Sequence, residues 1–167
     1  MSLSLYQSLI PPAIRMLSSL GKILEKAEQY ASDRHFNAKN LVGSRLFVDM
    51  HPLSKQIQIA SDVVKGGAAR LAGIESPRFE DNEETLEELR ARIDKTIAFL
   101  QSLTESQFEG AEDRLIELKF PNGMELSFKG LDYLQHWILP NLYFHSTTAY
   151  NILRHNGVII GKKDFLG

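Results

Sequence analysis

Apolar side chains recur at spacings of three and four residues along four segments of the chain. This is the period of an α-helix with one buried face. The first segment spans residues 4–31 and the second spans residues 51–73. The third carries its apolar stripe from residue 86 to residue 103, and the fourth runs from residue 130 to residue 156. Long helices that are apolar on one face pack together, so the pattern predicts a four-helix bundle.

Residues with special backbone preferences mark the ends of these helices. Pro52 suits the first turn of the second helix, and Gly73 can close that helix as a C-terminal cap. Asp81, followed three residues later by Glu84, resembles a capping arrangement before the third helix. Two successive glycines at residues 66–67 cost the second helix about 1 kcal/mol each relative to alanine. We therefore expect a neighbouring helix to approach closely at this point.

The apolar period changes from 3.6 to 2 between the third and fourth helices. Apolar and polar residues alternate on both sides of a Pro-Asn-Gly sequence at residues 121–123, which is typical of a β-hairpin. The alternating apolar residues are Ile116, Leu118, Phe120, Met124, Leu126 and Phe128. An isolated hairpin is marginal in water, so it should lie against the bundle. The chain is predicted to be one mainly all-α domain, residues 1–167, with a small hairpin between helices three and four.

The fourth segment is apolar on more than one face, as expected for a central helix or for one shared with a partner subunit. One stripe consists of Leu131, Leu134, Ile138, Leu142, His145, Ala149 and Ile152. A second stripe consists of Tyr133, Trp137, Phe144 and Thr148. Pro140 removes a backbone donor and predicts a kink near Leu139. Interspersed polar residues make the segment too polar to span a membrane.

Composition and charge narrow the classes of partner. The chain has 167 residues, 43% of them hydrophobic, which is enough for one well-buried domain. Its net charge of −2 favours neither nucleic acid nor an anionic membrane, and the absence of cysteine excludes disulfides and thiolate chemistry. The N-terminal residues do not resemble a signal peptide, so we expect a cytoplasmic protein.

Charged residues cover the outer face of the third helix. Glu88 and Arg92 are four residues apart and are predicted to form a surface ion pair. The acidic run at residues 79–89 is interpreted as the solvated start of this helix rather than as a cation site.

His145 is the one histidine of the last helix that its helical phase places on the core stripe. Two interpretations remain open for it. It is either a core residue hydrogen-bonded to a neighbouring helix, with Asn141 and Thr148 in one buried polar network, or a ligand in a site for a metal or small molecule.

Several motifs resemble those of a domain-of-unknown-function branch of the DinB/YfiT-like superfamily. They are MSLSLYQSLIPP, DMHPLSKQIQIASD, ARLAG, FED and PNLYFHSTTAYNILRHNGV, in the same helix order. The resemblance implies a four-helix bundle that is often dimeric. Many members hold a divalent metal through one histidine of the second helix and two of an H-x3-H motif on the last helix. Members with known roles include thiol-dependent transferases and isomerases.

Carried over residue by residue, the resemblance implies an incomplete metal site. His145 matches the first histidine of the H-x3-H motif, but Ala149 occupies the second position. His51 stands at the start of the second helix, and Gln56 lies about one turn inside it, near the expected ligand. His145, His51 and Gln56 are therefore the candidate ligands for a divalent metal such as zinc or nickel.

Two functions follow, and the sequence leaves open whether the protein is an enzyme. The favoured one is a non-catalytic or degenerate-site homodimer that binds a small molecule or is structural, with Tyr133, Trp137 and Phe144 as the candidate dimer interface. The alternative is a divalent-metal-dependent transferase or isomerase that uses His145 as a ligand.

Overall fold

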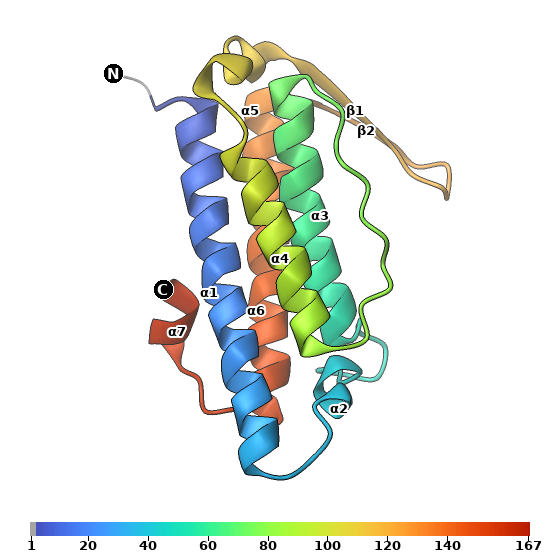
Figure 1. Ribbon diagram of the computed structural model, residues 1–167. Coiled ribbons are helices and arrows are strands. Elements are labelled where there is room, and N and C mark those ends of the chain that lie inside the picture. Colours follow the sequence, from blue (N-terminus) through green and yellow to red (C-terminus); the bar gives the residue numbers. More distant parts are fainter. Residues whose placement is uncertain (1–2) are drawn as a thin grey trace.

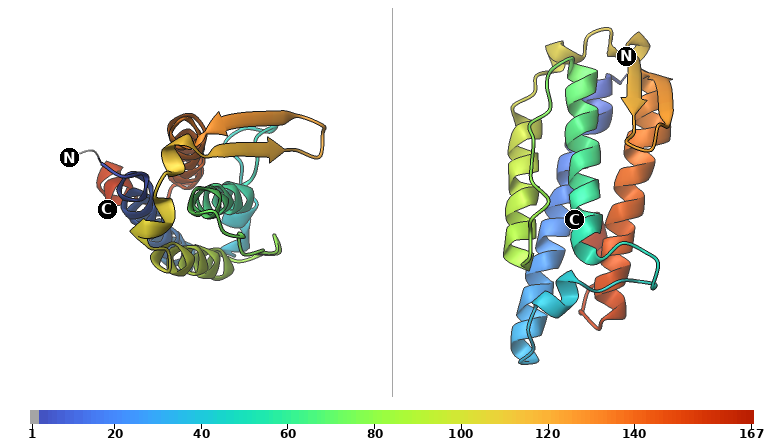
Figure 2. Two further views of the ribbon diagram at one scale, coloured as in Figure 1. Left: turned by 90° about the horizontal axis from the view of Figure 1, so that it is seen from above. Right: turned by 90° about the vertical axis from the view of Figure 1, so that its right-hand side faces the viewer.

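The computed structural model describes residues 3–167, so the first two residues of the predicted 1–167 domain lie outside it. Four long helices run side by side and form a bundle (Figure 1). They are α1 (Leu5–Asp33), α3 (Leu53–Ala72), α4 (Leu86–Gln101) and α6 (Leu139–His155). Seen along the bundle axis, they follow the cyclic order α1, α4, α3, α6 (Figure 2). The predicted helical bundle is confirmed.

Shorter elements connect and extend the four helices. Between α1 and α3 lies α2 (Lys39–Val42), the short turn of helix in a polar loop. Between α4 and α6 lie η1 (Glu105–Phe108), η2 (Ala111–Asp113), β1 (Leu115–Lys119), β2 (Glu125–Lys129), α5 (Gly130–Tyr133) and η3 (Leu134–Ile138). The chain ends in α7 (Lys162–Leu166), which packs against α1. No helix within residues 3–167 is both long enough and apolar enough to cross a bilayer.

The glycines of α3 behave as the sequence suggests. Gly73 adopts φ 70° and closes α3 as a left-handed cap, with its N–H directed to the carbonyls of Ala69 and Arg70. A Cβ atom on Gly67 would lie 2.5 Å from Cδ1 of Ile138, so the α3 backbone and the last helix meet at this glycine. The close approach predicted at residues 66–67 is confirmed.

The start of α4 differs from the prediction. The N-cap is Thr85, whose side chain accepts from the Glu88 N–H while Glu88 accepts from the Thr85 N–H. The capping box therefore begins four residues after Asp81. The sequence around Asp81 has the right spacing for a cap, but Asp81 faces the bundle and pairs with cations there.

The last helix is continuous from α5 through α6 but is not regular. The segment η3 is one π-helical stretch, and it ends just before Pro140, whose ring nitrogen cannot donate to the helix. A π turn contains an extra residue, which changes the phase of the residues before it. Leu131, predicted to face the core, is 42% exposed, and Gly130 is buried in its place.

The hairpin is confirmed. Strands β1 and β2 are antiparallel, with Ile116 opposite Phe128 and Leu118 opposite Leu126. Gly123 takes φ 82° in the connecting turn. The base of the hairpin lies on the last helix, because the ring of Phe128 packs 5.8 Å from that of Tyr133. The tip extends away from the bundle (Figure 1).

Candidate functional site

A chain of hydrogen bonds joins α3 to α6 near the first turn of α3. Gln56 is buried on α3, and its Oε1 lies 2.7 Å from Nδ1 of the partly buried His145 on α6. The same amide donates from Nε2 to the backbone carbonyl of His51 at 3.1 Å. The structure therefore brings together His51, Gln56 and His145.

The chemistry of these groups fixes the protonation of His145. A backbone carbonyl only accepts, so the amide NH₂ of Gln56 must face His51 and its oxygen must face His145. The imidazole then has to donate from Nδ1, so that in its neutral form Nε2 keeps the lone pair. Burial, and secondly electrostatic repulsion by the nearby His51 imidazole, lower the pKa of His145 below its ordinary value of 6.5. Both effects favour the neutral form of the His145 imidazole.

The Nε2 atom of His145 is the unused end of this arrangement. No hydrogen bond to it occurs within residues 3–167. The ring is held on its other side by an edge contact with Phe144, at 5.1 Å between centroids. An oriented imidazole with a free lone pair can accept a hydrogen bond from a ligand, take up a proton or bind a metal.

The polar network expected around His145 does not form. Nδ2 of Asn141 donates to the carbonyl of Trp137, and Oγ1 of Thr148 donates to the carbonyl of Phe144. Both are bonds to the residue four positions earlier in the same helix, where short polar side chains often find an acceptor. His145 instead bonds across to Gln56, as one of the two interpretations of this residue proposed.

A groove begins one helical turn beyond this pair. It has a volume of about 310 Å³ and lies between α3, the hairpin and the η3 segment. Asn141, one turn before His145 on the last helix, and Ile59, one turn after Gln56, both line it. His145 therefore lies next to the end of the groove but does not form its wall.

The comparisons with known proteins identify the fold. Residues 5–166 match the family described as a domain of unknown function, DUF1993. The chain belongs to this family. The crystal structure of a DinB family member protein from Shewanella denitrificans is 41% identical, with a TM-score of 0.90 over 98% of this chain and 92% of that one. No curated protein matches the chain. The DUF1993 chain is therefore DinB-like in both sequence and structure.

The residues of this DUF1993 chain do not fit a three-histidine metal centre. Ala149 is fully buried and offers no ligating atom. The Gln56 oxygen, a candidate ligand, already accepts from His145. Within residues 3–167, no group of three or more His, Cys, Asp or Glu side chains could hold a metal ion. Gln56 holds the position of an orienting partner for His145 rather than that of a second ligand.

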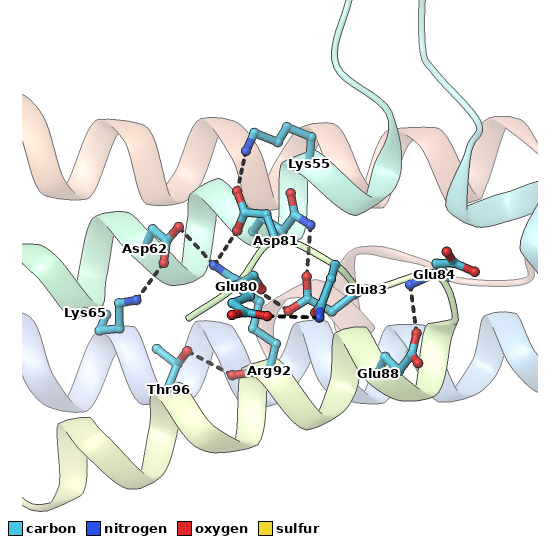
Figure 3. A network of polar contacts seen from close by, with 12 residues as sticks. Lys55, Asp62, Lys65, Glu80, Asp81, Glu83, Glu84, Glu88, Arg92 and Thr96 are labelled. Carbon is cyan, nitrogen blue, oxygen red and sulfur yellow. Dashed lines mark hydrogen bonds and ion pairs between the residues drawn. The ribbon is translucent and has the colours of Figure 1, made fainter. Parts of the chain in front are cut away.

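A second polar centre, which sequence reasoning missed, lies between α3 and α4 (Figure 3). Its middle is Arg92, whose side chain is only 1% exposed. The guanidinium pairs with Asp62 at 2.9 Å, Asp81 at 3.0 Å and Glu83 at 2.8 Å. It also donates to the carbonyl of Glu80 at 3.0 Å. Through these ion pairs and this hydrogen bond, the cluster holds residues 80–83 against the bundle.

Two sequence interpretations are corrected by this cluster. Arg92 points inward and does not pair with Glu88, because Glu88 caps its own helix. The acidic run is not a freely solvated helix start, since Asp81 and Glu83 are held by Arg92. The available signal was the position of Arg92 directly before the core residue Ile93, with acidic residues on both neighbouring segments.

The three candidate interface residues end up in different surroundings. Tyr133 is 1% exposed and therefore belongs to the core of the protomer, not to a surface. Trp137 is partly buried beneath the hairpin, with its ring 5.8 Å from Phe120 and 6.0 Å from Phe128. Phe144 is 58% exposed, next to the exposed Tyr143. Of these three residues, only Phe144 is a large apolar residue on the surface of the described protomer.

Proposed function

We propose that this DinB-like protein binds a small molecule in the groove between α3, the hairpin and the last helix, without chemical turnover. His145 would serve as a neutral hydrogen-bond acceptor at the end of that groove. The hydrogen-bond chain from the His51 carbonyl through Gln56 to His145 is the observation that carries the proposal. It orients the imidazole and leaves Nε2 without a partner in the described part of the chain.

The geometry favours binding over catalysis for a chemical reason. General acid–base chemistry benefits from a second titratable group close to the first. The direct partner of His145 is Gln56, which does not titrate, and Ala149 occupies the position of the second motif histidine. The nearby His51 joins the hydrogen-bond chain through its backbone carbonyl and not through its ring. A neutral acceptor beside a concave surface is sufficient to orient a bound molecule.

The test is NMR of the histidine side chains in the presence of a library of small polar and aromatic compounds. We expect His145 to be in the Nδ1–H form in the free protein and its Nε2 signal to shift when a compound binds. His136, which is exposed on the same helix, is the matched control and should not respond. If no compound moves the His145 signals, the proposed function is wrong.

We also propose that the protein is a homodimer in which Phe144 contributes to the interface. The support is the exposure of Phe144 beside Tyr143 on α6, where two large apolar rings face solvent in the isolated protomer. Light scattering should give twice the protomer mass, and Phe144→Glu should reduce it. Ile159→Glu, at another exposed apolar residue, should leave the mass unchanged.

A metal-dependent transferase or isomerase is the second candidate. One observation favours it: metal-binding histidines usually donate their other ring N–H to an oxygen, as His145 does to Gln56. Calorimetric titration of tag-free protein with zinc or nickel tests this candidate. One ion bound per protomer, lost in both His145→Ala and His51→Ala, would support it and count against a purely organic ligand.

A further inference from the structure

The groove contains a cation that is held in place but not neutralised. Arg70, near the end of α3, lines the groove, and its Nη1 donates to the hydroxyl of Tyr133 at 3.3 Å. Arg70 forms no ion pair with any residue between 3 and 167. An arginine offers five donors in a planar fork, so most of its hydrogen-bonding capacity remains available.

Gly66 makes room for this arginine. A Cβ atom at Gly66 would lie 2.8 Å from Nη1 of Arg70, so the guanidinium lies over the bare backbone one turn before its own Cα. A glycine inside a helix costs about 1 kcal/mol relative to alanine. The pair at residues 66–67 therefore has two uses, because Gly67 admits Ile138 and Gly66 admits the head of Arg70.

The other charges that line the groove are mostly compensated. Asp62 pairs with Arg92 at 2.9 Å and with Lys65 at 2.8 Å. Lys119 pairs with Glu125 across the hairpin at 3.4 Å. Glu117 is the remaining carboxylate, and it is exposed on β1. Arg70 is therefore the uncompensated cation of the groove, and it lies beside Tyr133, to whose hydroxyl it donates.

Aromatic rings form the rest of the wall next to Arg70. Trp137, Phe120 and Tyr133 all line the groove, and the Trp137 and Phe120 rings are 5.8 Å apart. Burial raises the pKa of Tyr133, although Arg70 opposes the shift, so its hydroxyl stays protonated at neutral pH. That hydroxyl accepts from Arg70 and is itself a donor.

We infer that the groove binds a small aromatic carboxylate, with its ring against Trp137 and Phe120 and its carboxylate on Arg70. Arginine and carboxylate form paired, charge-assisted hydrogen bonds, and flat rings stack on aromatic side chains. The volume of about 310 Å³ is at the small end of the range for ligand pockets, which restricts the ligand to a single ring system. This inference goes beyond the proposed function, because it assigns a ligand to the Arg70 end of the groove, about 21 Å along α3 from Gln56, where a single ring does not also reach His145.

The experiment uses the full chain and a matched pair of probes, phenylacetate and phenylacetamide. They have the same ring and nearly the same shape but differ in charge. Trp137 is the chain's single tryptophan, so its fluorescence reports directly on this groove. We expect phenylacetate to change the Trp137 emission and to bind at least about tenfold more tightly than the amide, because charged hydrogen bonds are stronger.

Two variants locate the effect. Arg70→Met keeps an unbranched side chain but removes the charge, and it should abolish the preference for phenylacetate. Lys119→Met removes the other cation of the groove, which is already paired, and should preserve that preference. If Lys119→Met removes the preference and Arg70→Met does not, the assignment to Arg70 is overturned.

The outcomes separate this inference from the proposed function. Equal binding of the two probes would overturn the carboxylate class and leave small-molecule binding intact. If neither probe binds but other compounds shift the His145 signals, the ligand class is again wrong and the proposed function stands. If no compound shifts the His145 signals and neither probe binds, both the inferred ligand class and the proposed function are wrong.

Discussion

The helix α3 carries two polar regions that differ in how completely their groups are paired. Toward α4, Asp62 joins the cluster in which Arg92 holds three carboxylates. Toward the last helix, Gln56 and His145 lie one turn from the end of the groove, and Arg70 lines it; within residues 3–167 the His145 Nε2 has no partner and Arg70 has no counter-ion. We call the first the closed region and the second the open region.

The difference indicates which polar residues maintain the fold and which are available to a ligand. In the closed region each charge has a counter-ion within the chain, although Nε of the buried Arg92 makes no hydrogen bond within residues 3–167. In the open region the chain holds the groups in place by single hydrogen bonds and leaves other donors and acceptors unused. Oriented donors and acceptors left unused next to a concave surface are available to a ligand.

The largest effect should come from breaking the closed region. Arg92→Met leaves Asp62, Asp81 and Glu83 without their shared cation, and we expect it to lower the free energy of unfolding by about 3 kcal/mol. Arg90→Met is the control, because Arg90 makes partly exposed pairs with Glu25 and Glu28 and should cost less than about 1 kcal/mol. Urea denaturation measures both. Equal losses would show that Arg92 is no more important than a surface arginine.

Replacing the orienting amide should disturb the open region less. Gln56→Leu leaves the His145 Nδ1–H and the His51 carbonyl without their partner, at an expected cost of about 1–2 kcal/mol. It should also allow both tautomers of His145, which histidine NMR detects. Gln29→Leu removes an exposed amide bonded to Asp33 and should change neither quantity. An unchanged Nδ1–H tautomer in Gln56→Leu would show that Gln56 does not fix it.

A methyl group at Gly67 tests the contact between α3 and the π turn beneath the groove. Gly67→Ala places Cβ against Ile138, and overpacking should outweigh the gain in helix propensity, for a net loss of about 1 kcal/mol. Gly21→Ala in α1 meets its nearest atom at an ordinary 3.9 Å and should stabilise instead. Thermal unfolding distinguishes the two signs. Stabilisation by Gly67→Ala would mean that Ile138 moves away easily.

Lowering the pH should distinguish the two regions, because their groups lose their stabilising contributions at different pH values. Of all these changes, we expect this one to have the smallest effect on the free energy of unfolding. The pKa of His145 is lowered on folding, so its contribution is full above its ordinary value of 6.5 and is lost as pH falls through the folded pKa. Burial opposes the shift of Asp81, but Lys55 and Arg92 hold its pKa below 3.8, so that contribution is lost only in stronger acid. His145→Gln should remove the loss of stability just below pH 6.5 but keep the loss of stability in stronger acid. A profile unchanged by His145→Gln would contradict the assignment.

The fold could be predicted from the sequence because it depends on periodic patterns. The candidate site could be predicted only in part. Helical phase placed His145 on the inner side of its helix, whereas Gln56 was singled out by the family resemblance, as a metal ligand rather than as the hydrogen-bond partner of His145. Arg92 was misplaced because local spacing suggested Glu88 as its partner, whereas the carboxylates that bind it come from α3 and the preceding loop. Partners that are distant in sequence leave no periodic signal. The π turn likewise shifted Leu131 and Tyr133 away from their predicted faces.

The π turn at Leu134–Ile138 also allows the last helix to change in length by one residue, which a regular helix cannot do without rotating one of its ends. A one-residue deletion in an α-helix normally rotates everything beyond it by about 100°. Here the extra residue lies between the part that supports the hairpin and the part that carries His145. Removing it would restore the α-helical pitch while leaving Leu131 on its exposed face and the downstream contacts of α6 unaltered. Relatives whose last helices differ in length by one residue can therefore keep the same His145 environment.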